Sequence, residues 1–107
     1  MTTYSDLANE KALKLYAKIK KLLQRELTYG IYDAVLTPGI DGKSFMIYCV
    51  KLPEKDTNKY LFFVDCEILK NYTVKYAVVD KAHNIKYFTH IIKAFERCEE
   101  ILYTEIL

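Results

Sequence analysis

The sequence predicts an α+β fold in which a helix, a four-stranded antiparallel sheet and a second helix follow one another in a single domain, residues 1–107. Two observations predict this fold class. Apolar residues recur with a helical period near both ends of the chain. Between these ends, short runs of tyrosine, valine, isoleucine and phenylalanine are separated by turn residues, as in strands joined by hairpins.

The first helix is expected over residues 5–29. Thr3 and Asp6 have the spacing of a capping box, Ser5 is a competing cap, and Gly30 is placed to end the helix. Its apolar residues fall on one face at a period near 3.6. They are Ala8, Ala12, Leu15, Ile19, Leu22, Leu23 and Leu27.

Four strands are expected, near residues 30–37, 44–52, 60–69 and 72–79. The connections between them are too short for parallel crossovers, so the strands should form an antiparallel meander. A final helix is expected over residues 83–104, with Asp80 or Asn84 as its cap. Its apolar stripe consists of Phe88, Ile91, Ile92, Phe95, Cys98 and Leu102.

We expect both helices to lie on one face of the sheet, because four strands spaced about 4.8 Å apart are wide enough for two helices packed about 9 Å apart. The second and third strands are apolar on both sides, so the uncovered face would expose Leu61, Phe63 and Leu69. This pattern predicts a homodimer through that face. The alternative is one helix on each face and a monomer.

Basic residues repeat at steps of three and four along each predicted helix, which places them on one side of it. Two such stripes side by side would attract a phosphate backbone, and a symmetric dimer would double them. The candidate nucleic-acid-binding residues are Lys11, Lys14, Lys18, Lys21 and Arg25, supported by Lys86, Lys93 and Arg97; His83 and His90 follow the same stepping. The alternative is that these are ordinary solvated faces, with Glu96 and Glu100 forming ion pairs within the last helix.

The net charge does not by itself indicate a polyanionic partner, because 16 basic and 14 acidic residues leave only +2. Cys49, Cys66 and Cys98 are far apart and lie in apolar runs, so we expect buried free thiols and a reducing intracellular, cytoplasmic location. Neither a membrane segment nor a secretory leader is expected. The tyrosine-, lysine- and isoleucine-rich composition resembles that of small proteins from AT-rich genomes, including viral ones.

Three charged residues, in the first predicted strand and in the turn that follows it, loosely resemble an enzymatic motif. Asp33, then Asp41 and Lys43, resemble the acid, acid and lysine pattern of the restriction-endonuclease-like nucleases. The resemblance implies two metal ligands and an electrostatic stabiliser, although Asp41 and Lys43 lie in a glycine turn rather than on a strand. Asp65 and Glu67 share one strand face, where they could bind a divalent metal or pair with Lys75.

The sequence therefore predicts a small non-enzymatic protein that dimerises and binds a macromolecule, with nucleic acid as the favoured partner. A protein-interaction or inhibitory module that uses the apolar sheet face is the alternative, and a metal-dependent nuclease is the third. We predict no catalytic residue, metal ligand, cofactor or small-molecule substrate.

Overall fold

The computed structural model describes residues 3–25 and 31–106. It contains helix α1 (Tyr4–Arg25), strands β1 (Tyr32–Pro38), β2 (Ser44–Lys51), β3 (Tyr60–Ile68), β4 (Val74–Asp80) and β5 (Ile85–Phe88), and helix α2 (Ile91–Ile106). The strands pair in sequence order, each antiparallel to the next. The α+β class and the antiparallel meander are confirmed, but the sheet has five strands rather than four. The predicted stop at Gly30 lies outside the described residues.

The start of α1 has the predicted capping box. The backbone N–H of Asp6 donates to Thr3 Oγ1 at 3.0 Å, and the backbone N–H of Thr3 donates to Asp6 Oδ2 at 3.4 Å. Two N–H groups that the first turn leaves free are satisfied in this way. The cap therefore fixes where α1 begins, and with it which side chains face the sheet.

The predicted start of the last helix at residue 83 is wrong, because residues 85–88 form β5 and α2 begins only at Ile91. The carboxylate of Asp80 accepts hydrogen bonds from the backbone N–H groups of Ala82 and Asn84, each at 2.9 Å. His83 has a φ of 68°. These local bonds close a tight reversal after β4, so Asp80 organises a hairpin turn and does not cap a helix.

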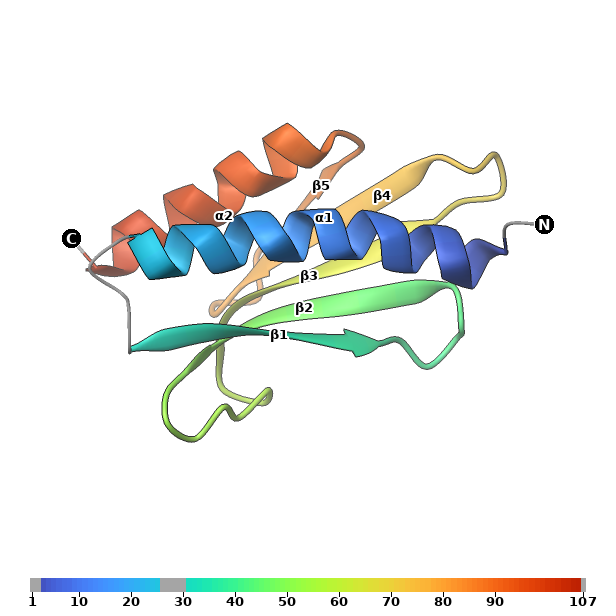
Figure 1. Ribbon diagram of the computed structural model, residues 1–107. Helices are drawn as coiled ribbons and strands as arrows, with labels where there is room; N and C mark the ends of the chain where they lie inside the picture. The colour runs from blue at the N-terminus through green and yellow to red at the C-terminus, as the bar shows by residue number, and fades with distance from the viewer. Residues whose placement is uncertain (1–2, 26–30, 107) are drawn as a thin grey trace.

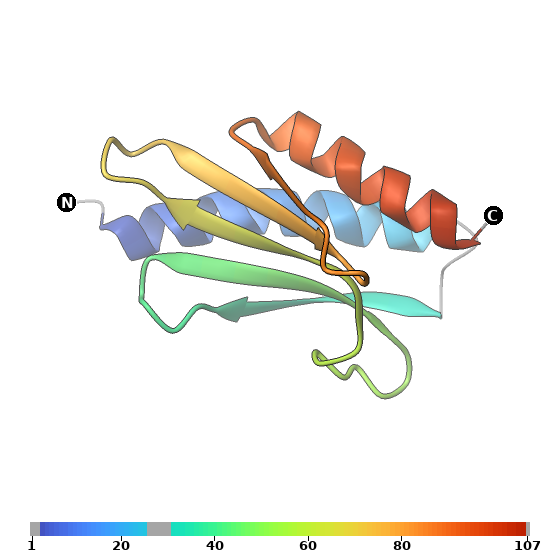
Figure 2. The ribbon, with the colours of Figure 1, turned by 180° about the vertical axis from the view of Figure 1, so that it is seen from behind.

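Both helices lie on one face of the sheet, as Figure 1 shows. α1 packs over β1, β2 and β3, while α2 packs over β3, β4 and β5. Figure 2 shows the sheet from behind, where no described helix crosses it; we call this side the open face. The molecule is therefore a two-layer structure with one layer of helices and one of strands.

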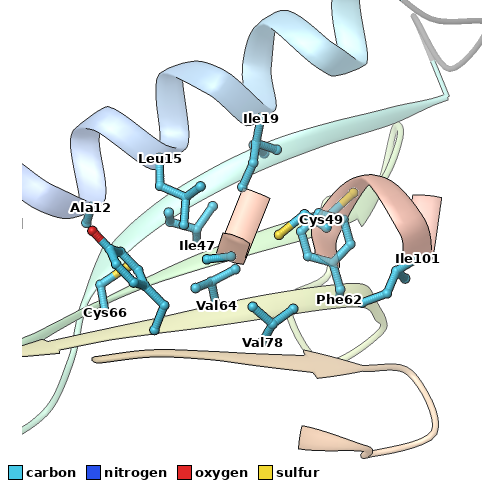
Figure 3. Close-up of a cluster of buried hydrophobic side chains, with 14 of the residues drawn as sticks. Ala12, Leu15, Ile19, Ile47, Cys49, Phe62, Val64, Cys66, Val78 and Ile101 are labelled. Atoms are coloured by element: carbon cyan, nitrogen blue, oxygen red, sulfur yellow. The ribbon is translucent and has the colours of Figure 1, made fainter. Parts of the chain in front are cut away.

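The core lies between these two layers. Leu15 and Ile19 of α1 and Phe62, Val64 and Ile47 of the sheet are fully buried there (Figure 3). Burial of each large side chain contributes about 1.5–3 kcal/mol, so this layer holds the helices in place.

The pairing of β2 with β3 contains one irregularity. Its register passes from Cys49 opposite Phe62 to Val50 opposite Tyr60, so Leu61 is an extra residue in β3. Such a β-bulge interrupts the two-residue alternation of side chains between the faces of a sheet.

The bulge corrects one predicted interface residue. Leu61 is only 5% exposed and belongs to the core together with Phe62. Tyr60 instead packs against Tyr48 and Phe63, with ring centroids 6.2 and 4.8 Å apart. The prediction that Leu61 lies on the open face is wrong, because it assumed unbroken alternation along β3.

The three cysteines are buried and free, as predicted. Burial raises the pKa of Cys49 and of Cys66 to about 12. Because the thiolate is the reactive form, both side chains behave as core residues at neutral pH.

Candidate nucleic-acid interface

Five basic residues of α1 form its basic face: Lys11, Lys14, Lys18, Lys21 and Arg25. Their spacing places them along one flank of the helix, beside the row that is buried against the sheet. Lys14, Lys21 and Arg25 are exposed, while Lys11 and Lys18 are half-buried. The Nζ atom of Lys18 lies 5.9 Å from the centroid of the Phe95 ring, so this flank faces α2.

Most of these cations lack an acidic partner. Among the described residues, Lys11, Lys18 and Lys21 form no ion pair with a carboxylate. Lys14 lies 3.6 Å from Glu10 in the next turn, with both side chains more than half exposed. Such exposed pairs contribute little and are readily exchanged for another anion.

The second predicted stripe is not a helix face. His83 lies in the β4–β5 turn, Lys86 lies in β5, and His90 precedes α2. Only Lys93 and Arg97 of that series belong to α2. The prediction failed because three-and-four spacing was extrapolated through a segment that forms a strand and a turn.

Arg97 has a structural role, because both ends of its guanidinium group contact carboxylates of the same chain. Its side chain is 13% exposed, its Nη2 lies 3.5 Å from Asp80 Oδ2, and its Nη1 donates to Glu100. Hydrogen bonds from Asn84, chiefly from its backbone, lower the pKa of Asp80, and the charge of Arg97 adds to this effect. Arg97 therefore fastens α2 to the end of β4 and is not available to a phosphate. Lys93 lies 3.6 Å from Glu96, as expected for an ion pair within the helix.

Asp33 also has a structural role. It accepts from Lys20 Nζ at 2.6 Å and lies 3.2 Å from Lys55 Nζ. Burial alone would raise the pKa of Asp33, but hydrogen bonds from Lys20, the Ala34 N–H and Lys55 outweigh it and lower the pKa. This pair of ion contacts ties β1 to α1 and to the β2–β3 connection.

The three nuclease-like residues do not assemble. Asp33 lies near the start of β1, and Asp41 lies beyond its end. Because a strand rises about 3.3 Å per residue, the two are more than about 15 Å apart. Asp41 accepts from the Lys43 N–H at 2.9 Å and from Ser44 Oγ at 3.0 Å, so it closes the β1–β2 turn. Within the described ranges, no group of three or more His, Cys, Asp or Glu residues could hold a metal ion.

The open face holds features that sequence reasoning missed. The rings of Tyr48, Tyr60 and Phe63 form one cluster, which depends on the bulge. Asp65 lies on the same face, and its Oδ1 is buried with no hydrogen-bond partner among the described residues. Alternation of side chains placed Asp65 there, but nothing in the sequence indicates that its oxygen has no partner.

Asp65 also lines a cavity of about 480 Å³ at the β1–β2 side of this face. Met46 and Tyr48 of β2 and Thr57 of the β2–β3 connection also line it. Glu67, the other predicted carboxylate, pairs with Lys75 at 3.5 Å, as expected for cross-strand neighbours.

No protein-family model matches the chain, and comparisons with curated proteins and with solved structures give no match either. The functional argument therefore depends on the fold and on the side chains. In the described part of the chain, neither helix is long and apolar enough to cross a membrane.

Proposed function

We propose that the protein binds the phosphate backbone of nucleic acid through the basic face of α1. The observation that carries this proposal is the contrast between the two helices. Both cations of α2 have carboxylate partners, whereas among the described residues Lys11, Lys18 and Lys21 of α1 have none.

The charge of the two helices supports the same surface. α1 contains six basic and two acidic residues, while α2 contains two basic and four acidic residues. The positive potential is therefore concentrated on one helix rather than shared by two. The basic face extends over four turns, about 21 Å, which matches roughly six successive phosphates of one DNA strand.

Contacts of this kind should give affinity without sequence preference, because lysine and arginine then neutralise phosphates and read no base edges. Five such contacts would give a slope of about −4.5 when the logarithm of the binding constant is plotted against the logarithm of salt concentration. A slope near zero would contradict phosphate binding.

The proposal is tested with a fluorescently labelled duplex and a labelled single strand, whose anisotropy is measured at low salt. The triple variant Lys14→Glu, Lys18→Glu, Lys21→Glu should lose nearly all binding. The matched control, Lys51→Glu, Lys59→Glu, Lys70→Glu, makes the same change in net charge at exposed positions outside α1 and should bind far better. Equal losses in both variants, or no binding by the natural chain, would refute the proposal.

A protein-interaction module is the second candidate function. The observation that favours it is the aromatic cluster of Tyr48, Tyr60 and Phe63 on a sheet face that no described helix covers. This candidate uses the opposite side of the molecule from the basic face of α1, so the two proposals stand or fall separately.

A further inference from the structure

The register of the sheet aligns apolar side chains across the whole open face. One residue from each strand falls into a single row, because each is the pairing partner of the next. This central row consists of Val35, Tyr48, Phe63, Val79 and Ile85. A second row, two residues further along β1, consists of Thr37, Met46, Asp65, Ala77 and Tyr87.

The β4 and β5 side of this face is the more exposed. Ile85 is 49% and Tyr87 is 62% exposed, although both are large apolar side chains on a strand. Their partners Val79 and Ala77 are already buried by their own neighbours. The edge strand therefore supplies most of the apolar surface that remains in contact with water.

We propose that the open face pairs with the open face of a second copy of this chain. A third row, on the other side of the central row, contains Asp33, Val50 and Tyr60. Five strands spaced about 4.8 Å apart and three rows spaced about 6.8 Å along them give a face of roughly 480 Å² in projection. Two copies would together cover about 1,000 Å², which reaches the size that specific interfaces need.

The interface is largely preformed. The ring centroids of Tyr48 and Phe63 lie 5.4 Å apart, and Tyr60 packs edge-on against Phe63. Side chains that already support one another lose little conformational freedom on association, so more of the burial energy remains as affinity.

The charges on the face favour one symmetric arrangement. Asp65 and Glu67 lie on the same side of the central row, towards the end of β3. A twofold axis that lies along the central row stacks this row on its own copy and places the carboxylates of the two chains at opposite ends of the interface. Any arrangement that superimposes these ends would bring like charges together.

The same arrangement keeps the Asp65 side chains of the two copies apart. In β3, Tyr60 lies on the other side of the central row from Asp65, so the twofold axis sets each Asp65 opposite the partner's Tyr60. The Tyr60 hydroxyl, 3.1 Å from His83 Nδ1, is a neutral group, so no like charge faces Asp65 across the interface.

Light scattering at micromolar concentration tests the pairing. The natural chain should have the mass of two copies, and the double variant Ile85→Lys, Tyr87→Lys should have the mass of one, with self-association weakened about 30-fold or more. Both side chains are exposed in the single chain, so these changes leave the core intact, and circular dichroism checks that the variants are folded.

Ile92→Lys is the matched control, because Ile92 is 53% exposed on α2, away from the open face. It should remain a dimer. A natural chain with the mass of one copy, a dimeric Ile85→Lys, Tyr87→Lys variant, or a control that dissociates equally would each overturn the proposal.

The orientation has its own test. Because the native cysteines are buried, a thiol introduced at Ile85 can be joined by a short bifunctional maleimide to its own copy only if the two residues meet near the axis. Ile85→Cys should yield a covalent dimer, and Ile92→Cys should not. Rapid cross-linking at Ile92 with none at Ile85 would refute the arrangement.

Discussion

Among single residues, Asp65 is one whose place on the sheet follows from the sequence, whereas the energetic cost of its burial does not. Burial raises the pKa of Asp65, and the charges of Glu67 and Asp41 raise it further, while Lys75 opposes them. The folded chain therefore holds the proton on Asp65 more tightly than the unfolded chain does. The free energy of unfolding should fall as the pH rises from the ordinary value of 3.8 through the raised pKa.

Asp65→Asn removes the charge that burial disfavours. At pH 7 this variant should be more stable by about 1 kcal/mol, because a buried charge without a partner is costly. Urea unfolding measures the difference in stability. Both proteins carry Ile85→Lys and Tyr87→Lys, so that the proposed pairing is blocked. The gain should shrink as the pH falls towards 3.8. A gain that does not depend on pH would contradict this account.

Other residues differ in how far the sequence determines them. The cap between Thr3 and Asp6 is predictable because both partners lie within one turn. The role of Arg97 is not, because its partner Asp80 is 17 residues away and meets it only after β5 has reversed the chain. Local bonds follow from spacing, whereas contacts between elements require the fold.

At the scale of elements, the sequence predicts α1 and the first four strands well, since each has a long periodic pattern or clear turn residues at its ends. β5 is missed because it has only four residues, and Phe88 also fits the helical period of the residues that follow it. The turn at Asp80 makes this segment a strand and not the start of the helix. The turn is held by hydrogen bonds to particular backbone N–H groups, which cannot be predicted from composition.

Because the bulge in β3 turns Leu61 into the core, shortening this side chain should destabilise the protein. Leu61→Ala should lower the free energy of unfolding by about 2–5 kcal/mol, because it removes a core side chain and leaves a cavity. Ile85→Ala, at a half-exposed position of the sheet, is the comparison and should cost much less. Denaturant unfolding measures both in the Tyr87→Lys background. A loss below about 1 kcal/mol for Leu61→Ala would mean that Leu61 is not part of the core.

For the whole molecule, the one-sided placement of the helices follows from sheet width and apolar stripes, and so it could be predicted. The basic surface could be predicted only in part. α1 keeps five of its six cations on one flank, but the second stripe depended on a helix that begins eight residues later than expected. The open face was predicted to be apolar, yet its composition changed with the bulge, since Tyr60 lies there in place of Leu61.

The one-sided placement also changes what a dimer would do. If two open faces meet, the two α1 helices lie on opposite outer surfaces, about 30 Å apart when each layer is taken as about 10 Å. The protein itself then stands between the two basic faces, so one straight duplex cannot lie on both. Such a dimer would not double the positive charge facing one nucleic acid, as the sequence analysis expected; it would join two nucleic acids, one on each side.

This consequence can be measured by energy transfer between two short duplexes, one carrying a donor dye and one an acceptor. The natural chain should bring the dyes together at stoichiometric concentrations. The Ile85→Lys, Tyr87→Lys variant should still bind each duplex and yet give no transfer, whereas equal transfer by both proteins would exclude tethering through the sheet. If both proposals hold, placing both described helices on one side of the sheet gives the dimer of this small chain the geometry of a cross-linker, with one nucleic acid bound on each of its two outer surfaces.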